Sequence, residues 1–160
     1  MIARVVAMLL LPFVHLWAKR HERGILRHGS RLSMQQLEDA ARVGVQEADR
    51  VRVVVVQTVP PRLPRFLRKL AARCGLGPAT TAGMALGHGI YVRADQYGRR
   101  ELLVHELVHT AQYERLGFGR FLRQYLRECF ADGYPAGKLE AEATRLASGS
   151  LSAADQDSIT

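Results

Sequence analysis

The chain has 160 residues, of which 48% are hydrophobic and 24% charged, and its formal net charge is +8. This length suits one domain with its own core, and the composition excludes a fibrous or disordered chain. Cys74 and Cys129 lie far apart and form no CxxC pair, which excludes a structural zinc knuckle and argues against a disulfide framework. We therefore expect two buried thiols in a reducing, cytoplasmic compartment.

Residues 1–32 form an apolar and then basic N-terminal segment. Its apolar run, Val5 to Val14, is shorter than the ~20 residues that a membrane-spanning helix needs. Basic residues follow at once, namely Lys19, Arg20, Arg23 and Arg27. Two interpretations stay open: peripheral membrane contact through residues 2–31, and a helix that packs on its own domain. A cleaved signal peptide and a true membrane span are less favoured than either.

The pattern from residue 33 onward predicts alternating helices and strands. Ser33 and Gln36 form a capping box, which predicts a helix start. The β-branched residues 50–59 predict a buried strand, and residues 65–75 predict a short basic helix that ends at a glycine. Residues 89–93, GIYVR, predict a further strand, which we expect at an edge of the sheet.

Three helical patterns follow in the second half of the chain. The first runs from about Arg100 to Leu116, the second covers residues 118–130 with apolar and arginine-rich faces, and the third begins at Leu139. The small polar residues 149–160 predict a disordered tail. Together these elements predict a single α+β domain over residues 33–148.

The stretch HELVH carries His105, Glu106 and His109 in the HExxH spacing. On a helix, residues four apart differ by ~40° around the axis, so the two imidazoles point the same way and can share one metal ion. Glu106 lies ~100° further round than His105, where a carboxylate can reach a water at that ion. The pattern therefore predicts a Zn²⁺ site with Glu106 as the catalytic general base.

A catalytic zinc takes three protein ligands, and no histidine follows His109. The third ligand must therefore be a weaker donor or a carboxylate. Glu114 lies off the face of its own helix, and Glu128 sits among arginines. Glu140 and Glu142 remain, on a separate helix that can return to the site.

HELVH followed by LEAEATRLA resembles the gluzincin group of metallopeptidases. The resemblance is closest to minimal zincin-like domains and to the catalytic core of CAAX-protease and heat-shock-protease type enzymes. It implies a small zincin-like domain, in which the active-site helix packs on a short sheet with further helices. It also implies that Glu140 completes the metal site together with His105 and His109.

The resemblance implies two further roles. In such zincins an edge strand before the active-site helix pairs with an extended peptide, which assigns substrate binding to Ile90, Tyr91 and Val92. The family's Asp that orients a ligand histidine falls at Thr144, which can accept an imidazole N–H but brings no charge. Asp132 is a substitute for that orienting residue.

The sequence thus predicts a zinc-dependent peptidase acting on peptides or proteins. The alternative is a catalytically inactive zincin scaffold that binds a protein or nucleic-acid partner through arginines such as Arg62, Arg65, Arg68 and Arg73. These arginines belong to no known nucleic-acid motif, so we do not expect a nucleic-acid partner. Glu106 favours the enzyme, because a scaffold needs no carboxylate beside its metal ligands.

Overall fold

The computed structural model describes residues 2–59, 64–75, 77, 79–131 and 133–157. Within these residues it contains six α-helices and a four-stranded sheet, so the predicted α+β class is confirmed. The helices are α1 (Ile2–His28), α2 (Met34–Arg42), α3 (Arg68–Arg73), α4 (Arg100–Leu116), α5 (Phe118–Ala131) and α6 (Lys138–Asp157). The strands are β1 (Ser30–Arg31), β2 (Arg52–Val56), β3 (Gly83–Leu86) and β4 (Gly89–Arg93).

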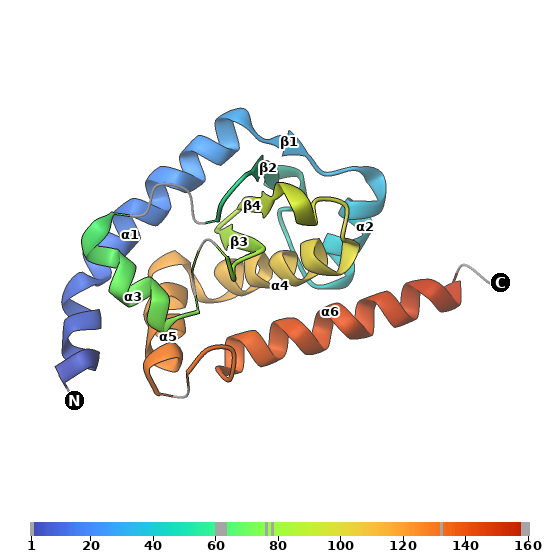
Figure 1. The fold of residues 1–160 in the computed structure, drawn as a ribbon. Helices are drawn as coiled ribbons and strands as arrows, with labels where there is room; N and C mark the ends of the chain where they lie inside the picture. The colour runs from blue at the N-terminus through green and yellow to red at the C-terminus, as the bar shows by residue number, and fades with distance from the viewer. Residues whose placement is uncertain (1, 60–63, 76, 78, 132, 158–160) are drawn as a thin grey trace.

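The sheet lies between two layers of helices (Figure 1). Side chains alternate across β4: Ile90 packs with α2, α4 and α6, whereas Tyr91 packs with α1 and α5. Helix α1 therefore covers one face of the sheet and α4 the other, and α6 packs beyond α4. The site helix is fixed on both sides by apolar packing, because Val104, Leu107 and Val108 are almost fully buried.

The strand order is β1-β2-β4-β3, with β2 parallel to β4 and β3 antiparallel to β4. The prediction that Gly89–Arg93 is an edge strand is therefore wrong. The glycine-rich residues before it form a strand of their own, β3, which turns back at Gly87 with a φ of +64°. Ile90, Tyr91 and Val92 are 0%, 8% and 4% exposed, so they belong to the core and cannot bind a peptide as an edge.

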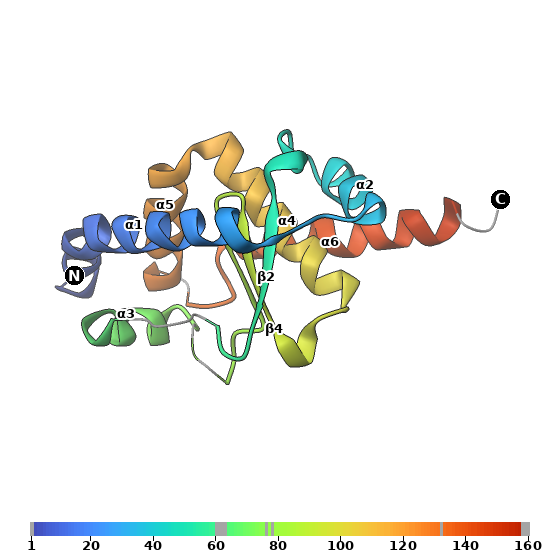
Figure 2. The same ribbon diagram turned by 90° about the horizontal axis from the view of Figure 1, so that it is seen from above.

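The N-terminal segment is one continuous helix that packs on the domain. Ala18, Glu22 and Ile25 of α1 are buried against the sheet and α5, and Figure 2 shows α1 lying across the strands. One face of this helix therefore packs on its own domain, as one of the two interpretations expected, and peripheral membrane contact through its other face stays a prediction. Among the described residues, no helix is both long and apolar enough to cross a membrane.

The tail from Gly149 is not disordered as we expected, because α6 continues to Asp157. Leu146 and Leu151 pack against the core of the α4 side of the sheet and hold this part of the helix. The hydroxyl of Ser152 donates to the carbonyl of Ser148 within the same helix. Residues 158–160 lie outside the described part of the chain.

Candidate metal centre

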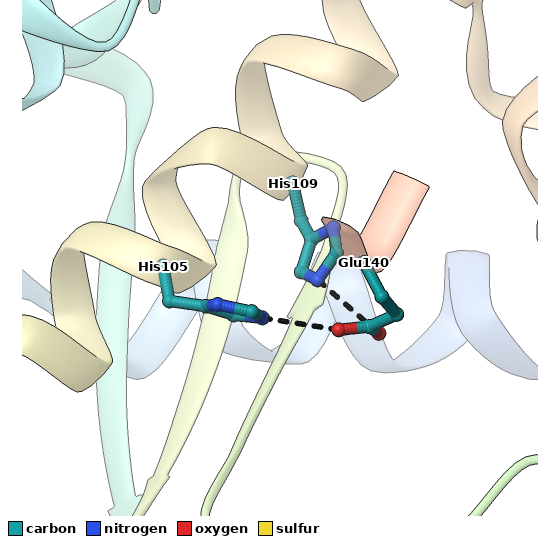
Figure 3. Close-up of side chains that lie close together, drawn as sticks. All are labelled: His105, His109 and Glu140. Carbon is teal, nitrogen blue, oxygen red and sulfur yellow. Dashed lines mark ion pairs between the residues drawn. The ribbon is translucent and has the colours of Figure 1, made fainter. Parts of the chain in front are cut away.

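His105 and His109 of α4 converge with Glu140, which lies in the first turn of α6 (Figure 3). The Nε2 atom of His105 is 3.2 Å from Oε2 of Glu140, and Nε2 of His109 is 3.5 Å from Oε1. The three ligand atoms all lie within 4.8 Å of one another. The structure thus brings together the two helical histidines and the carboxylate that the resemblance implied.

Two hydrogen bonds fix the start of α6 and therefore the position of Glu140. The backbone N–H of Leu139 donates to Oε2 of Glu128 on α5 at 2.9 Å. Its carbonyl accepts from Nε2 of Gln112 on α4 at 3.0 Å. Both backbone groups of the residue before Glu140 are thereby held by neighbouring helices.

Gln112 also determines which nitrogen of His109 carries a proton. Its Nε2 donates to the Leu139 carbonyl and to Glu142, so its Oε1 is an acceptor. That oxygen lies 2.8 Å from Nδ1 of His109, which must therefore donate. In the neutral imidazole the lone pair is then on Nε2, the atom that faces Glu140.

A lone pair directed at a carboxylate is unfavourable unless a cation lies between them. A tetrahedral zinc with bonds of about 2.0–2.1 Å separates its ligand atoms by roughly 3.3 Å. The observed 3.2 Å and 3.5 Å, each to a different oxygen of Glu140, are close to this spacing. They exceed the roughly 2.7–2.9 Å of a charge-assisted hydrogen bond between such groups. His105, His109 and Glu140 are therefore placed so that they could hold a metal ion, and zinc accepts such a donor set.

Tyr125 of α5 holds the carboxylate of Glu140 from the other side. Its hydroxyl donates to Oε1 of Glu140 at 2.7 Å. Burial by itself raises the pKa of Glu140, but the adjacent imidazoles of His105 and His109 and the hydroxyl of Tyr125 outweigh it and lower that pKa well below its usual value. Glu140 is therefore an anion in the folded protein, as a metal ligand must be.

The pKa of His109 responds to the same carboxylate. Burial lowers this pKa, but Glu140 and Glu106 outweigh burial and raise it above its usual value. A proton on Nε2 is the only cation that the residues themselves can place between the imidazole and Glu140. Metal binding must displace that proton, which makes affinity depend on pH.

Glu106 is 5% exposed and lies against β3, where a Cβ built on Gly83 would come within 2.6 Å of its Oε1. Burial raises its pKa, and the two histidines and a backbone hydrogen bond from Ala85 lower it in part. The net raised pKa suits a group that accepts and then releases a proton.

The three ligands and Glu106 line a cavity of about 380 Å³. Its remaining walls are largely apolar and come from α1, β3 and α5, including Trp17, Ala18, Met84, Leu86, Phe121 and Leu122. This volume accommodates a few side chains of an extended ligand rather than a folded domain.

The edge strand beside the cavity is β3 rather than β4. The N–H of Arg93 donates to the carbonyl of Ala82, which fixes the hydrogen-bonding register of the pair. Because these bonds alternate along an antiparallel strand, the backbone groups of Gly83 and Ala85 point away from β4. On this outer side of β3 the Ala85 N–H donates to Glu106, and the backbone groups of Gly83 and the Ala85 carbonyl also point away from β4.

Among the described residues, Thr144 makes no hydrogen bond to His105 or His109. It is exposed one turn beyond Glu140, and among the described residues Gln112 is the side chain that bonds a ligand imidazole through its other nitrogen. Gln112 follows His109 by three residues on the same helix, so helical spacing gave a signal for it. Glu142 binds Arg115 and Gln112, and Asp132 lies outside the described residues.

Comparisons of the chain with protein-family models, with curated proteins and with solved structures found no match. The chemistry of the site therefore has to be argued from its own geometry.

Proposed function

We propose that the protein is a zinc-dependent peptidase, with the zinc held by His105, His109 and Glu140. The observation that supports this most strongly is the contact of Gln112 Oε1 with Nδ1 of His109, because it leaves Nε2 of the neutral imidazole facing a buried anion. A site of this kind needs a cation at its centre, which is a proton on Nε2 when no metal is bound and zinc in the proposed active form. Two imidazoles and one carboxylate form a donor set typical of catalytic zinc.

Glu106 is the general base of the proposed reaction. Zinc in such a site acts as a Lewis acid and lowers the pKa of water to about 7. Glu106 takes the proton of the attacking water and passes it to the leaving amine of the peptide. Its burial and raised pKa support both steps, because the group must bind the proton and then release it.

The proposed substrate is an extended peptide that pairs with β3. The backbone groups of Gly83 and the carbonyl of Ala85, which point away from β4, bind peptide backbone by β-augmentation, with little demand on sequence. Glycine at position 83 leaves room for the carboxylate of Glu106 beside that strand. The function that we first assigned to Ile90, Tyr91 and Val92 thus passes to the neighbouring strand.

The alternative of an inactive scaffold explains less of the site. A scaffold has no use for a buried carboxylate such as Glu106, whose ionised form is disfavoured by desolvation. The buried thiols of Cys74 and Cys129, far apart in the sequence, lie in hydrogen-bond contact with each other in the structure.

Peptide-library cleavage tests this function. The purified protein should cut extended peptides, lose that activity after treatment with a zinc chelator and regain it when zinc is restored. Cleavage that persists without bound metal would refute the proposal, as would the absence of cleavage in protein that carries one zinc per chain.

A further inference from the structure

The outer face of α1 carries an unusual arrangement of exposed side chains. Leu9, Phe13 and Leu16 are 69%, 55% and 66% exposed, although each is large and apolar. The next outward positions, one to three turns on, are Arg20, Arg23 and Arg27, all exposed. At about 100° per residue, these six positions fall within an arc of roughly 80°. One face of the helix is therefore apolar at its start and basic further along.

This arc lies opposite the face that packs on the domain. Ala18, Glu22 and Ile25 are buried and lie on the other side of the same helix. The exposed apolar residues are consequently not part of the core. Large apolar side chains that stay this exposed next to one another are a usual mark of a binding surface.

The segment around α3 extends the surface. The ring of Phe66, itself 57% exposed, lies 6.0 Å from that of Phe13 in an edge-to-face arrangement. Arg65 and Arg68 flank it and are exposed, and both views place α3 beside the N-terminal half of α1 (Figures 1 and 2). Arg62, which the sequence grouped with these arginines, lies outside the described residues.

We propose that this surface, formed by Leu9, Phe13, Leu16 and Phe66 with the arginines beside them, docks the protein on an anionic lipid membrane. Apolar side chains enter the headgroup region while neighbouring arginines bind lipid phosphates. No spanning helix is required, which agrees with the hydropathy of the described helices.

The charge and polarity of this surface favour a membrane over two other binding partners. A second copy of the chain would bring two sets of arginines into one interface, where like charges repel. A nucleic acid would satisfy the arginines but would leave Leu9 and Leu16 exposed to water. An anionic bilayer matches both halves of the surface.

Co-sedimentation with lipid vesicles tests the proposal. The full-length protein should bind vesicles of phosphatidylglycerol and phosphatidylcholine in equal parts, and should bind pure phosphatidylcholine far more weakly. Raising the ionic strength should weaken binding, because the headgroup attraction is screened. The triple variant L9S/F13S/L16S should lose roughly 100-fold in partitioning, since three apolar side chains no longer enter the lipid.

Matched control variants distinguish binding through this surface from nonspecific effects of exposed apolar side chains and of net charge. Met34→Ser removes an apolar side chain that is 74% exposed on α2, and should leave binding unchanged. Arg20→Gln with Arg23→Gln should weaken binding by roughly tenfold or more. Arg31→Gln with Arg145→Gln removes the same charge elsewhere and should have a much smaller effect. The emission of Trp17, the single tryptophan, verifies folding of every variant.

Three results would overturn the proposal. The first is equal binding to neutral and anionic vesicles, and the second is wild-type binding by the triple variant. The third is a dimer that the triple variant dissociates, in a protein that binds no vesicles, because it would assign the surface to a second copy of the chain. None of these outcomes depends on whether the protein is a peptidase.

Discussion

The Oε1 atom of Gln112 accepts a hydrogen bond of 2.8 Å from Nδ1 of His109, and both side chains are buried. Gln112 cannot reverse this role, because its amide nitrogen is committed to the Leu139 carbonyl and to Glu142. The pair fixes the imidazole as a ligand with its lone pair on Nε2. It also joins the site helix to α6, which carries the third ligand.

Gln112→Leu should weaken zinc binding by about 10–100-fold, because the imidazole loses the partner that orients it. Isothermal titration of the metal-free protein with zinc measures this. Glu142→Gln is the matched control, since it removes a neighbouring charge but leaves the bond between Gln112 and Leu139 in place. Equal losses in the two variants would contradict the orienting role.

Tyr125→Phe should weaken zinc binding by about tenfold, because it removes the hydroxyl that donates to Oε1 of Glu140 and changes little else. Thr144→Val is its comparison, at the position where the family resemblance implied an orienting residue. It should bind zinc like the wild type in the same titration. A larger effect at Thr144 than at Tyr125 would favour the assignment made from sequence.

Gly83→Ala should abolish cleavage while leaving zinc content unchanged. The added Cβ would lie 2.6 Å from Oε1 of Glu106 and must displace that carboxylate. Gly24→Ala is the control, because nothing lies within 4 Å of a Cβ built there in α1. It should stabilise the protein by about 0.5–1 kcal/mol and leave cleavage intact. If the Gly83→Ala variant kept its cleavage activity, Glu106 beside β3 would not be the general base.

The start of the site helix is held by an ion pair. Asp39 is 1% exposed and accepts from Nε and Nη2 of Arg100, at 2.9 Å and 2.7 Å. Asp39→Ala should therefore cost about 2–3 kcal/mol in urea unfolding, because Arg100 is left beside the core and only in part reaches water. Asp95→Ala, at an exposed ion pair with Arg93, should change stability little. Equal stabilities of the two variants would contradict this account.

The histidines and Glu106 were predictable because helical spacing alone places them. The capping box at Ser33 and Gln36 is likewise local, and both of its hydrogen bonds are present. Glu140 was assigned as the third metal ligand only through the family resemblance. The residues themselves left Glu142 as an alternative ligand. The structure brings Glu140 to the histidines and pairs Glu142 with Arg115 instead.

The position of β4 within the sheet was not predictable from local sequence patterns. Residues 83–86 include a glycine and an alanine, both with weak strand propensity, and they become a strand because β4 supplies the backbone partners. The neighbours of β4 are set by this long-range pairing. The sequence of β4 itself therefore does not indicate that the strand lies inside the sheet. The contact between Gln112 and the Leu139 carbonyl was hidden for the same reason, although its spacing from His109 was visible.

The central claim is that Glu106 performs proton transfer beside a His-His-Glu zinc. Glu106→Gln keeps the size of the side chain and removes its charge, so cleavage of the peptide library and zinc content should be measured on the same preparation. The account predicts about one zinc per chain, as in the wild type, with a loss of roughly 100-fold or more in cleavage rate. Wild-type cleavage by the zinc-loaded Glu106→Gln protein would contradict it.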